Sequence, residues 1–201
     1  MLLEPQEIEH ESMRLIQEAI GEYSGPDENL PVIKRVIHAT ADFDFLHTLD
    51  FSDGAVSLAR EALCNRTPII TDTNMLAAGI SKRYGVNIVC HVADEAVRSE
   101  AQSRKITRAI VNIEHSVREY PSAIYAIGNA PTALIRLCEL IREGRASPSL
   151  VIGVPVGFVN VLEAKNMLAS LTHIPRIIAH GRKGGSTVAC AIVNALLYGL
   201  E

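Results

Sequence analysis

The chain has 201 residues, with 19 basic and 23 acidic side chains, and its formal net charge is −4 at pH 7. This length suits one buried core and is short for two full domains, so we expect a single domain over residues 1–201. The weak acidic balance provides no field that would recruit nucleic acid or an acidic membrane surface. Nine Phe and Tyr residues and no Trp leave little aromatic surface for stacking a flat ring.

The basic side chains are mostly arginines, with 14 Arg against five Lys. Arginine suits two-point capture of carboxylates or phosphates, which hints at an anionic ligand, although solvated surface arginines are the commoner explanation. The cysteines form no C-x-x-C pair and the histidines no HxH or HExxH pattern, so we expect no protein-bound metal. Without a signal-like segment or a run of ~18 apolar residues, we expect a cytoplasmic protein.

Residues 1–45 are predicted to form a helical segment that carries candidate site residues. Apolar residues recur at helical spacing over residues 4–19, and Gly21 ends the pattern. A second helix follows a Gly/Pro-marked loop, and its buried side is expected to carry Val32, Ile33, Val36 and Ile37. His38 falls at the end of this helix, one turn after Arg35 and on the same face.

After residue 45 the chain alternates β-rich runs with helical segments, which is typical of a sheet with crossover helices. The predicted strands lie in TPIITD, VNIVCHV, SAIYAIGNAP, SLVIGVPVG and PRIIAHGRKGG. Four of these runs are nearly continuous apolar stretches, as expected of parallel strands covered on both faces. Helices are expected over residues 94–120, broken near Ser103, and over 131–143, 159–170 and 187–197. The predicted fold class is α/β with a mainly parallel sheet.

Polar or Gly-rich turns follow four of the predicted strands. They comprise residues 71–72, 128–132, 153–157 and 181–186. In an open α/β sheet the carboxyl ends of the strands share one edge, where ligands bind near a topological switch point. We therefore expect these turns to line a single crevice.

Two of the turns are candidate anion sites. In GRKGGS, Gly184 and Gly185 precede an apolar helix and could present several main-chain N–H groups to a carboxylate or phosphate. In AIGNAPTAL, Gly128 and Asn129 leave main chain close to whatever fills the crevice, just before Pro131 starts a helix. Neither turn has the spacing of a Walker loop or of G-x-G-x-x-G, and plain turn chemistry is the alternative for both.

His38 has more support as a functional residue than the other histidines. Imidazole titrates near neutral pH, so a partly buried His38 could give a proton to a bound substrate and take it back. Arg35 would orient an acidic group and oppose charging of the ring. Because no Ser-His-Asp or Cys-His set is evident, the pattern favours proton transfer over nucleophilic catalysis. A structural histidine on an amphipathic helix is the alternative.

Six ordered blocks together resemble the precorrin-8X methylmutase family, also called cobalt-precorrin-8 methylmutases. The blocks are IEHESMRLI, VIHATADFDF, PIITDTNMLAAGI, YAIGNAPTAL, VIGVPVGFVN and GRKGGSTVACAIVNAL. The resemblance covers nearly the whole chain. It implies an isomerase of cobalamin biosynthesis that moves a methyl group from carbon 11 to carbon 12 of a corrin precursor, giving cobyrinate or hydrogenobyrinate. It implies no cofactor, since any cobalt belongs to the substrate.

The resemblance also implies roles for individual residues. His38 matches the acid/base residue, Ser12 and Arg35 match substrate-contacting residues, and Arg108 aligns with a further arginine of the site. The carboxylate arms of a corrin precursor would account for the Arg preference and for the Gly-rich turns. The implied fold is a flavodoxin-like three-layer α/β/α sandwich, and the implied assembly is a homodimer with the site near the subunit interface. The HATADF block is more similar to the cobalt-containing branch.

Two other functions are compatible with parts of the sequence. A non-catalytic corrinoid carrier could use the same crevice, but a carrier has no need of a titratable group such as His38 beside the ring. A flavin- or nucleotide-binding protein of flavodoxin-like fold is disfavoured by the missing phosphate-loop spacing and the few aromatic residues.

Overall fold

The computed structural model describes residues 4–200. The helices are α1 (Pro5–Ile20), α2 (Leu30–Thr40), α3 (Phe45–Thr48), α4 (Ala55–Cys64), α5 (Asn74–Gly79), α6 (Glu95–Arg104), α7 (Arg108–Glu119), α8 (Pro131–Arg142), α9 (Val161–Ala169) and α10 (Ser186–Tyr198), with a 3₁₀ turn, η1 (Lys82–Tyr84). The strands are β1 (Leu49–Phe51), β2 (Ile69–Thr71), β3 (Ile88–Val89), β4 (Ile124–Ile127), β5 (Leu150–Gly153) and β6 (Arg176–Ala179). Within the described part of the chain, no helix has the length and apolar character needed to span a membrane.

The strands form one sheet in the order β1-β6-β5-β4-β2-β3. Strand β1 pairs antiparallel with β6, and the other pairs are parallel. Counted among themselves in chain order, the five parallel strands have the order 2-1-3-4-5, which is the flavodoxin-like arrangement. The predicted fold class is therefore confirmed, and the switch point of the sheet lies between β2 and β4.

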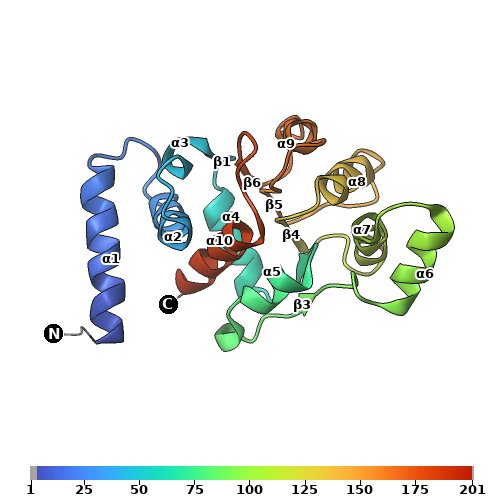
Figure 1. Cartoon of the computed structure of the whole chain (residues 1–201), viewed down its shortest axis with the longest axis horizontal. Helices are drawn as coiled ribbons and strands as arrows, with labels where there is room; N and C mark the ends of the chain where they lie inside the picture. Colours follow the sequence, from blue (N-terminus) through green and yellow to red (C-terminus); the bar gives the residue numbers. More distant parts are fainter. Residues whose placement is uncertain (1–3, 201) are drawn as a thin grey trace.

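Helices cover both faces of the sheet, so the molecule has three layers (Figure 1). Strand β4 shows how the sequence encodes the two faces, because alternate side chains of a strand point in opposite directions. Ile124 and Ala126 belong to the core formed with α2, α4 and α10. Tyr125 and Ile127 belong to the core formed with α7, α8 and α9. Burial on both faces explains why this strand reads as a continuous apolar run.

The first two helices form the end of the molecule that is farthest from β3 (Figure 1). Helix α2 packs on α10 through the four predicted side chains, Val32, Ile33, Val36 and Ile37, all of which are buried. Helix α1 packs on α2 and stands outside the two layers that cover the sheet. Ala41 ends α2 in the left-handed conformation, so His38 lies in the last turn, as predicted.

Some elements differ from the sequence-based expectations. Strand β1 and helices α4 and α5 were not predicted. β1 has only three residues and depends on pairing with the edge of β6, which no local pattern reveals. The expected helix break near Ser103 falls a little later, where Lys105 adopts a left-handed conformation and the Thr107 side chain caps α7.

Candidate active site

His38 and Ser12 lie on one cavity of about 320 Å³ between the first two helices. The cavity is otherwise lined by Leu15, Ile16, Ile37, Ala41 and Phe43. The amphipathic pattern of α2 buries Ile37 in the core, so the next residue, His38, is turned outward toward α1. His38 is exposed in the single chain, so the partial burial that would favour its acid/base role is not present there.

Ser12 is half-buried, and its hydroxyl donates a hydrogen bond to the main-chain oxygen of Ile8, one turn earlier in α1 (2.7 Å). The hydroxyl proton is therefore used within the helix, while oxygen lone pairs remain available toward the cavity. Ser12 is thus arranged to accept a hydrogen bond from a group bound beside His38.

Arg35 lines a different cavity, of about 540 Å³, at the other end of α2. Its Nη2 atom lies 2.9 Å from Glu9 Oε1, and its guanidinium carbon lies 4.8 Å from the centroid of the Tyr198 ring. These contacts direct Arg35 toward α10 and the start of α1. The structure therefore does not place Arg35 beside His38, although the two residues are one helical turn apart.

The carboxylate of Asp72 fills the switch point of the sheet. Its oxygens accept hydrogen bonds from the main-chain N–H groups of Gly128 (3.1 Å), Asn129 (2.7 Å) and Ala130 (2.7 Å). Burial raises the pKa of Asp72, and the three N–H donors oppose this rise. The turns meet at one edge as predicted, but the expectation that the main chain of Gly128 and Asn129 stays free for a ligand is wrong. The exposed side chain of Asn129 remains available.

The loop after β6 borders the end of α2. Gly184, together with Thr40, Asp42 and Lys183, lines a cavity of about 280 Å³. A Cβ at Gly184 would lie 2.2 Å from the carbonyl oxygen of Val154, so only glycine allows this close approach to the loop after β5. The N–H of Gly185 donates to the same oxygen (2.9 Å) and is not free for an anion.

Arg108 begins α7, on the opposite face of the sheet from His38. The hydroxyls of Thr107 and Thr132 lie 3.2 Å apart, so the start of α7 is adjacent to the start of α8 at the carboxyl edge of the sheet. Arg108 is exposed there and does not line the cavity of His38 and Ser12. Within one chain, the structure therefore places these two predicted site residues on helices that pack on opposite faces of the sheet.

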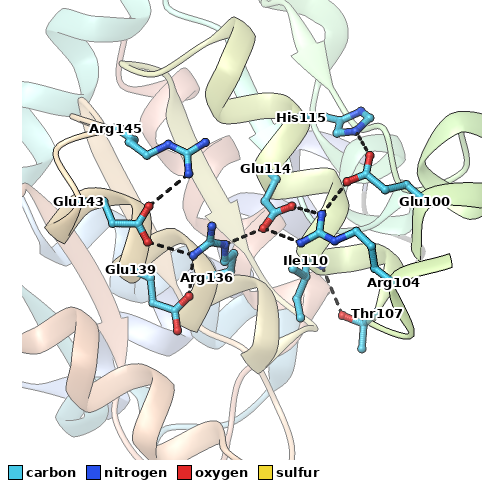
Figure 2. Close-up of polar contacts among 10 residues, drawn as sticks. All are labelled: Glu100, Arg104, Thr107, Ile110, Glu114, His115, Arg136, Glu139, Glu143 and Arg145. Atoms are coloured by element: carbon cyan, nitrogen blue, oxygen red, sulfur yellow. Dashed lines mark hydrogen bonds and ion pairs between the residues drawn. The ribbon is translucent and has the colours of Figure 1, made fainter. Parts of the chain in front are cut away.

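A charged network joins α6, α7 and α8, as Figure 2 shows. At its centre the buried Glu114 forms ion pairs with Arg104 from α6 (2.5 Å) and with Arg136 from α8 (2.7 Å). The hydrogen bond from Arg104 is the main reason that the pKa of Glu114 is lowered. Glu100 extends the network to His115 (2.7 Å). Because these ion pairs span three helices, they fix the turn from which Arg108 projects.

Lys165 is a buried residue that the sequence reasoning missed. It lies on the apolar side of α9, and its neighbours on that side are Val161, Ala164 and Leu168. A lysine in such an i, i+3, i+4, i+7 pattern interrupts an otherwise apolar stripe, and this interruption could have identified it. Asp72 gave no comparable signal, because its partners lie more than 50 positions away.

Together, the fold and the site define a flavodoxin-like α/β protein in which a histidine on the N-terminal helices, rather than a phosphate loop at the switch point, marks the candidate active site. A family model described as precorrin-8X methylmutase matches residues 7–199. The chain belongs to the precorrin-8X methylmutase family.

Individual relatives agree with this assignment over nearly the full length. The cobalt-precorrin-8 methylmutase of Salmonella typhimurium is 43% identical over 209 residues, covering 98% of this chain and 97% of the relative. The cobalt-precorrin-8 methylmutase of Priestia megaterium is 40% identical over 200 residues, covering 98% of this chain and 88% of the relative. The crystal structure of precorrin-8X methylmutase from Thermus thermophilus superposes with a TM-score of 0.90 at 39% identity, covering 96% and 95%.

Proposed function

We propose that this chain, an isomerase of cobalamin biosynthesis, moves a methyl group from carbon 11 to carbon 12 of cobalt-precorrin-8 and releases cobyrinate. The observation that carries this proposal is the position of His38 on a cavity shared with Ser12, in a chain of this family. The cobalt-containing substrate is supported by the HATADF block and by the names of the two bacterial relatives, both cobalt-precorrin-8 methylmutases. A cytoplasmic location stays a prediction from the sequence.

In the proposed mechanism His38 acts as the acid and base. The bond from the methyl group to carbon 11 breaks as the bond to carbon 12 forms, so the rearrangement consumes no electrons. One proton delivered to the macrocycle and later returned would assist the shift, which is a task for an imidazole near neutral pH. Substrate lying over the exposed ring of His38 would exclude water from it. This chemistry requires no resident cofactor, and cobalt enters only as part of the substrate.

We also propose that the active form is a homodimer in which Arg108 of one subunit serves the site of the other. Arg108 and His38 lie on opposite faces of one sheet, and Arg108 does not line the cavity of His38 and Ser12, which supports a role for Arg108 in the site of the partner subunit. Large apolar side chains are exposed on α1 and on the loop after β5, as a covered interface would require. They include Ile8 and Leu15 (each 52% exposed), Phe158 (84%) and Val159 (77%).

The test is anaerobic incubation with cobalt-precorrin-8 and, separately, with metal-free precorrin-8, following the visible spectrum as conjugation changes. We expect turnover with the cobalt substrate, and a loss of about 100-fold or more in kcat for His38→Ala with substrate binding retained. The exposed His173, far along the chain from the site, provides a matched control in His173→Ala. Unchanged turnover by His38→Ala would refute the acid/base role. Binding without turnover by the unmodified protein would indicate a carrier, and preference for the metal-free substrate would overturn the cobalt assignment.

A further inference from the structure

Lys165 is 1% exposed although it carries an ammonium group. Its Nζ donates hydrogen bonds to the carbonyl oxygens of Gly181 (2.7 Å) and Lys183 (2.8 Å). Burying an amine is unfavourable unless hydrogen bonds replace its water, and burial lowers the pKa of Lys165 to about 8. The buried lysine of α9 therefore binds two main-chain carbonyl groups of the loop after β6 and fixes the position of that loop.

The side chain of Lys183 extends from the same loop to two carboxylates. Its Nζ lies 2.6 Å from Asp42 Oδ2 and 2.6 Å from Asp44 Oδ2. The hydrogen bond from Lys183 lowers the pKa of Asp42, and Asp42 Oδ1 also accepts from the N–H of Asp44 (3.0 Å). Lys165 therefore restrains the loop after β6, and this loop, through Lys183, restrains the segment of residues 42–44 that follows α2.

This segment follows directly on the turn that carries His38. Ala41 ends α2 with a φ of 53°, a conformation that is unfavourable for a residue with a side chain. Helix ends also fray readily, and His38 lies in the last turn. Ion pairs to residues 42 and 44 from another part of the fold would restrain this turn. Neither lysine lines the cavity that His38 shares with Ser12.

We propose that Lys165 and Lys183 are positioning residues for His38. Lys165 fixes the loop after β6 through two carbonyl groups, and Lys183 transmits that position to the end of α2 through Asp42 and Asp44. The direction in which the imidazole of His38 enters its cavity is thereby set from α9, across the carboxyl edge of the sheet. This inference rests on the proposed acid/base role of His38.

Lys183→Met tests the link at an exposed position, where folding is not at stake. We expect kcat to fall about tenfold while KM changes less than about twofold, because a displaced acid/base group impairs the chemical step rather than binding. Lys183→Arg, which keeps the cation, should restore most of the lost kcat. Lys82→Met, at another exposed lysine, is the matched control and should behave as the unmodified protein does.

A second readout reports on His38 itself. The NMR signal of the His38 ring Cε1–H group should change in position or width in Lys183→Met and in Lys165→Met, but not in Lys82→Met. An unchanged signal together with full kcat in Lys183→Met would overturn the proposal. If Lys165→Met does not fold, the kcat and the His38 NMR signal of Lys183→Met alone decide whether the proposal holds.

The His38→Ala background separates this inference from the proposed function. There, adding Lys183→Met should leave the residual kcat within about twofold, since the residue that it positions is gone. A further tenfold loss would show that Lys183 acts elsewhere and would refute the inference. If His38→Ala alone turned over at the native rate, the acid/base role of His38 would fail, whereas the NMR signal of His38 in the unmodified background would still decide whether the lysines position it.

Discussion

Asp72 Oδ2 lies 2.7 Å from the main-chain nitrogen of Ala130, a residue 58 positions further along the chain. This contact places a carboxylate of the protein at the switch point, beside the first turn of α8. In nucleotide-binding proteins with this strand order, the anionic part of the ligand lies at the equivalent position. Because Asp72 occupies it here, the carboxyl ends of β2 and β4 are closed, and the candidate site lies instead on α1 and α2.

Replacing Asp72 is predicted to destabilise the whole fold. Asp72→Ala would remove the acceptor of the N–H groups of residues 128–130, of which Gly128 is buried, and should lower the free energy of unfolding by about 3 kcal/mol. Asp72→Asn keeps one acceptor oxygen and should lose less. Urea unfolding measures both, with the exposed Asp53→Ala as control. A loss below about 0.5 kcal/mol for Asp72→Ala would contradict this account of the switch point.

Ser12→Ala is predicted to weaken substrate binding without harming the helix. The Ser12 hydroxyl bonds back to Ile8 within α1, and alanine is the better helix former, so stability should stay the same or rise slightly. Loss of the acceptor oxygen beside His38 should raise KM about three- to tenfold, with kcat nearly unchanged. Steady-state kinetics with Ser103→Ala as control would check this. An unchanged KM would remove Ser12 from the site.

The pKa of Lys165 predicts a pH dependence of stability. Its folded value of about 8 lies below its ordinary value of 10.5, so between these values the unfolded chain binds a proton that the folded protein does not. The contribution of Lys165 to stability therefore rises with pH across this window and is smallest below pH 8. As the pH rises from about 8 to 10.5, the free energy of unfolding of the unmodified protein should increase by up to about 3 kcal/mol relative to that of Lys165→Met.

Chemical denaturation of both proteins at several pH values measures this difference. Taking the difference removes the contributions of the tyrosines and cysteines, which titrate in both. Lys82→Met, which replaces an exposed lysine, is the control for the loss of a lysine as such. Parallel curves for Lys165→Met would mean that Lys165 keeps its ordinary pKa in the fold.

Subunit complementation tests whether Arg108 acts across a dimer interface. His38→Ala and Arg108→Ala should each be inactive alone. If each site is formed by His38 of one subunit and Arg108 of the other, a mixed dimer would have one intact site and one site that lacks both residues. Random pairing of co-expressed chains should therefore restore about a quarter of the native activity. No recovery would place both residues in the same subunit, and an active Arg108→Ala would exclude Arg108 from the site.

Local patterns in the sequence were enough to predict most of the elements that position the site. The spacing of Val32, Ile33, Val36 and Ile37 predicted the buried side of α2 and the place of His38 in its last turn. Continuous apolar runs predicted the parallel strands, since a strand covered on both faces has no polar side. The order of six sequence blocks was enough to indicate the family.

Contacts between distant segments were decided only by the tertiary structure. Periodicity shows which side of an element is buried, but it does not show which polar groups meet when the chain returns to the same edge of the sheet. For this reason the pairing of β1 with β6, the capture of the Gly128 and Asn129 amides by Asp72, and the hydrogen bonds of buried Lys165 were not foreseen. Arg35 and His38, neighbours on one helix, were likewise directed to different cavities by what packs against α2, because helix–helix contacts are set by the fold and not by spacing along the chain.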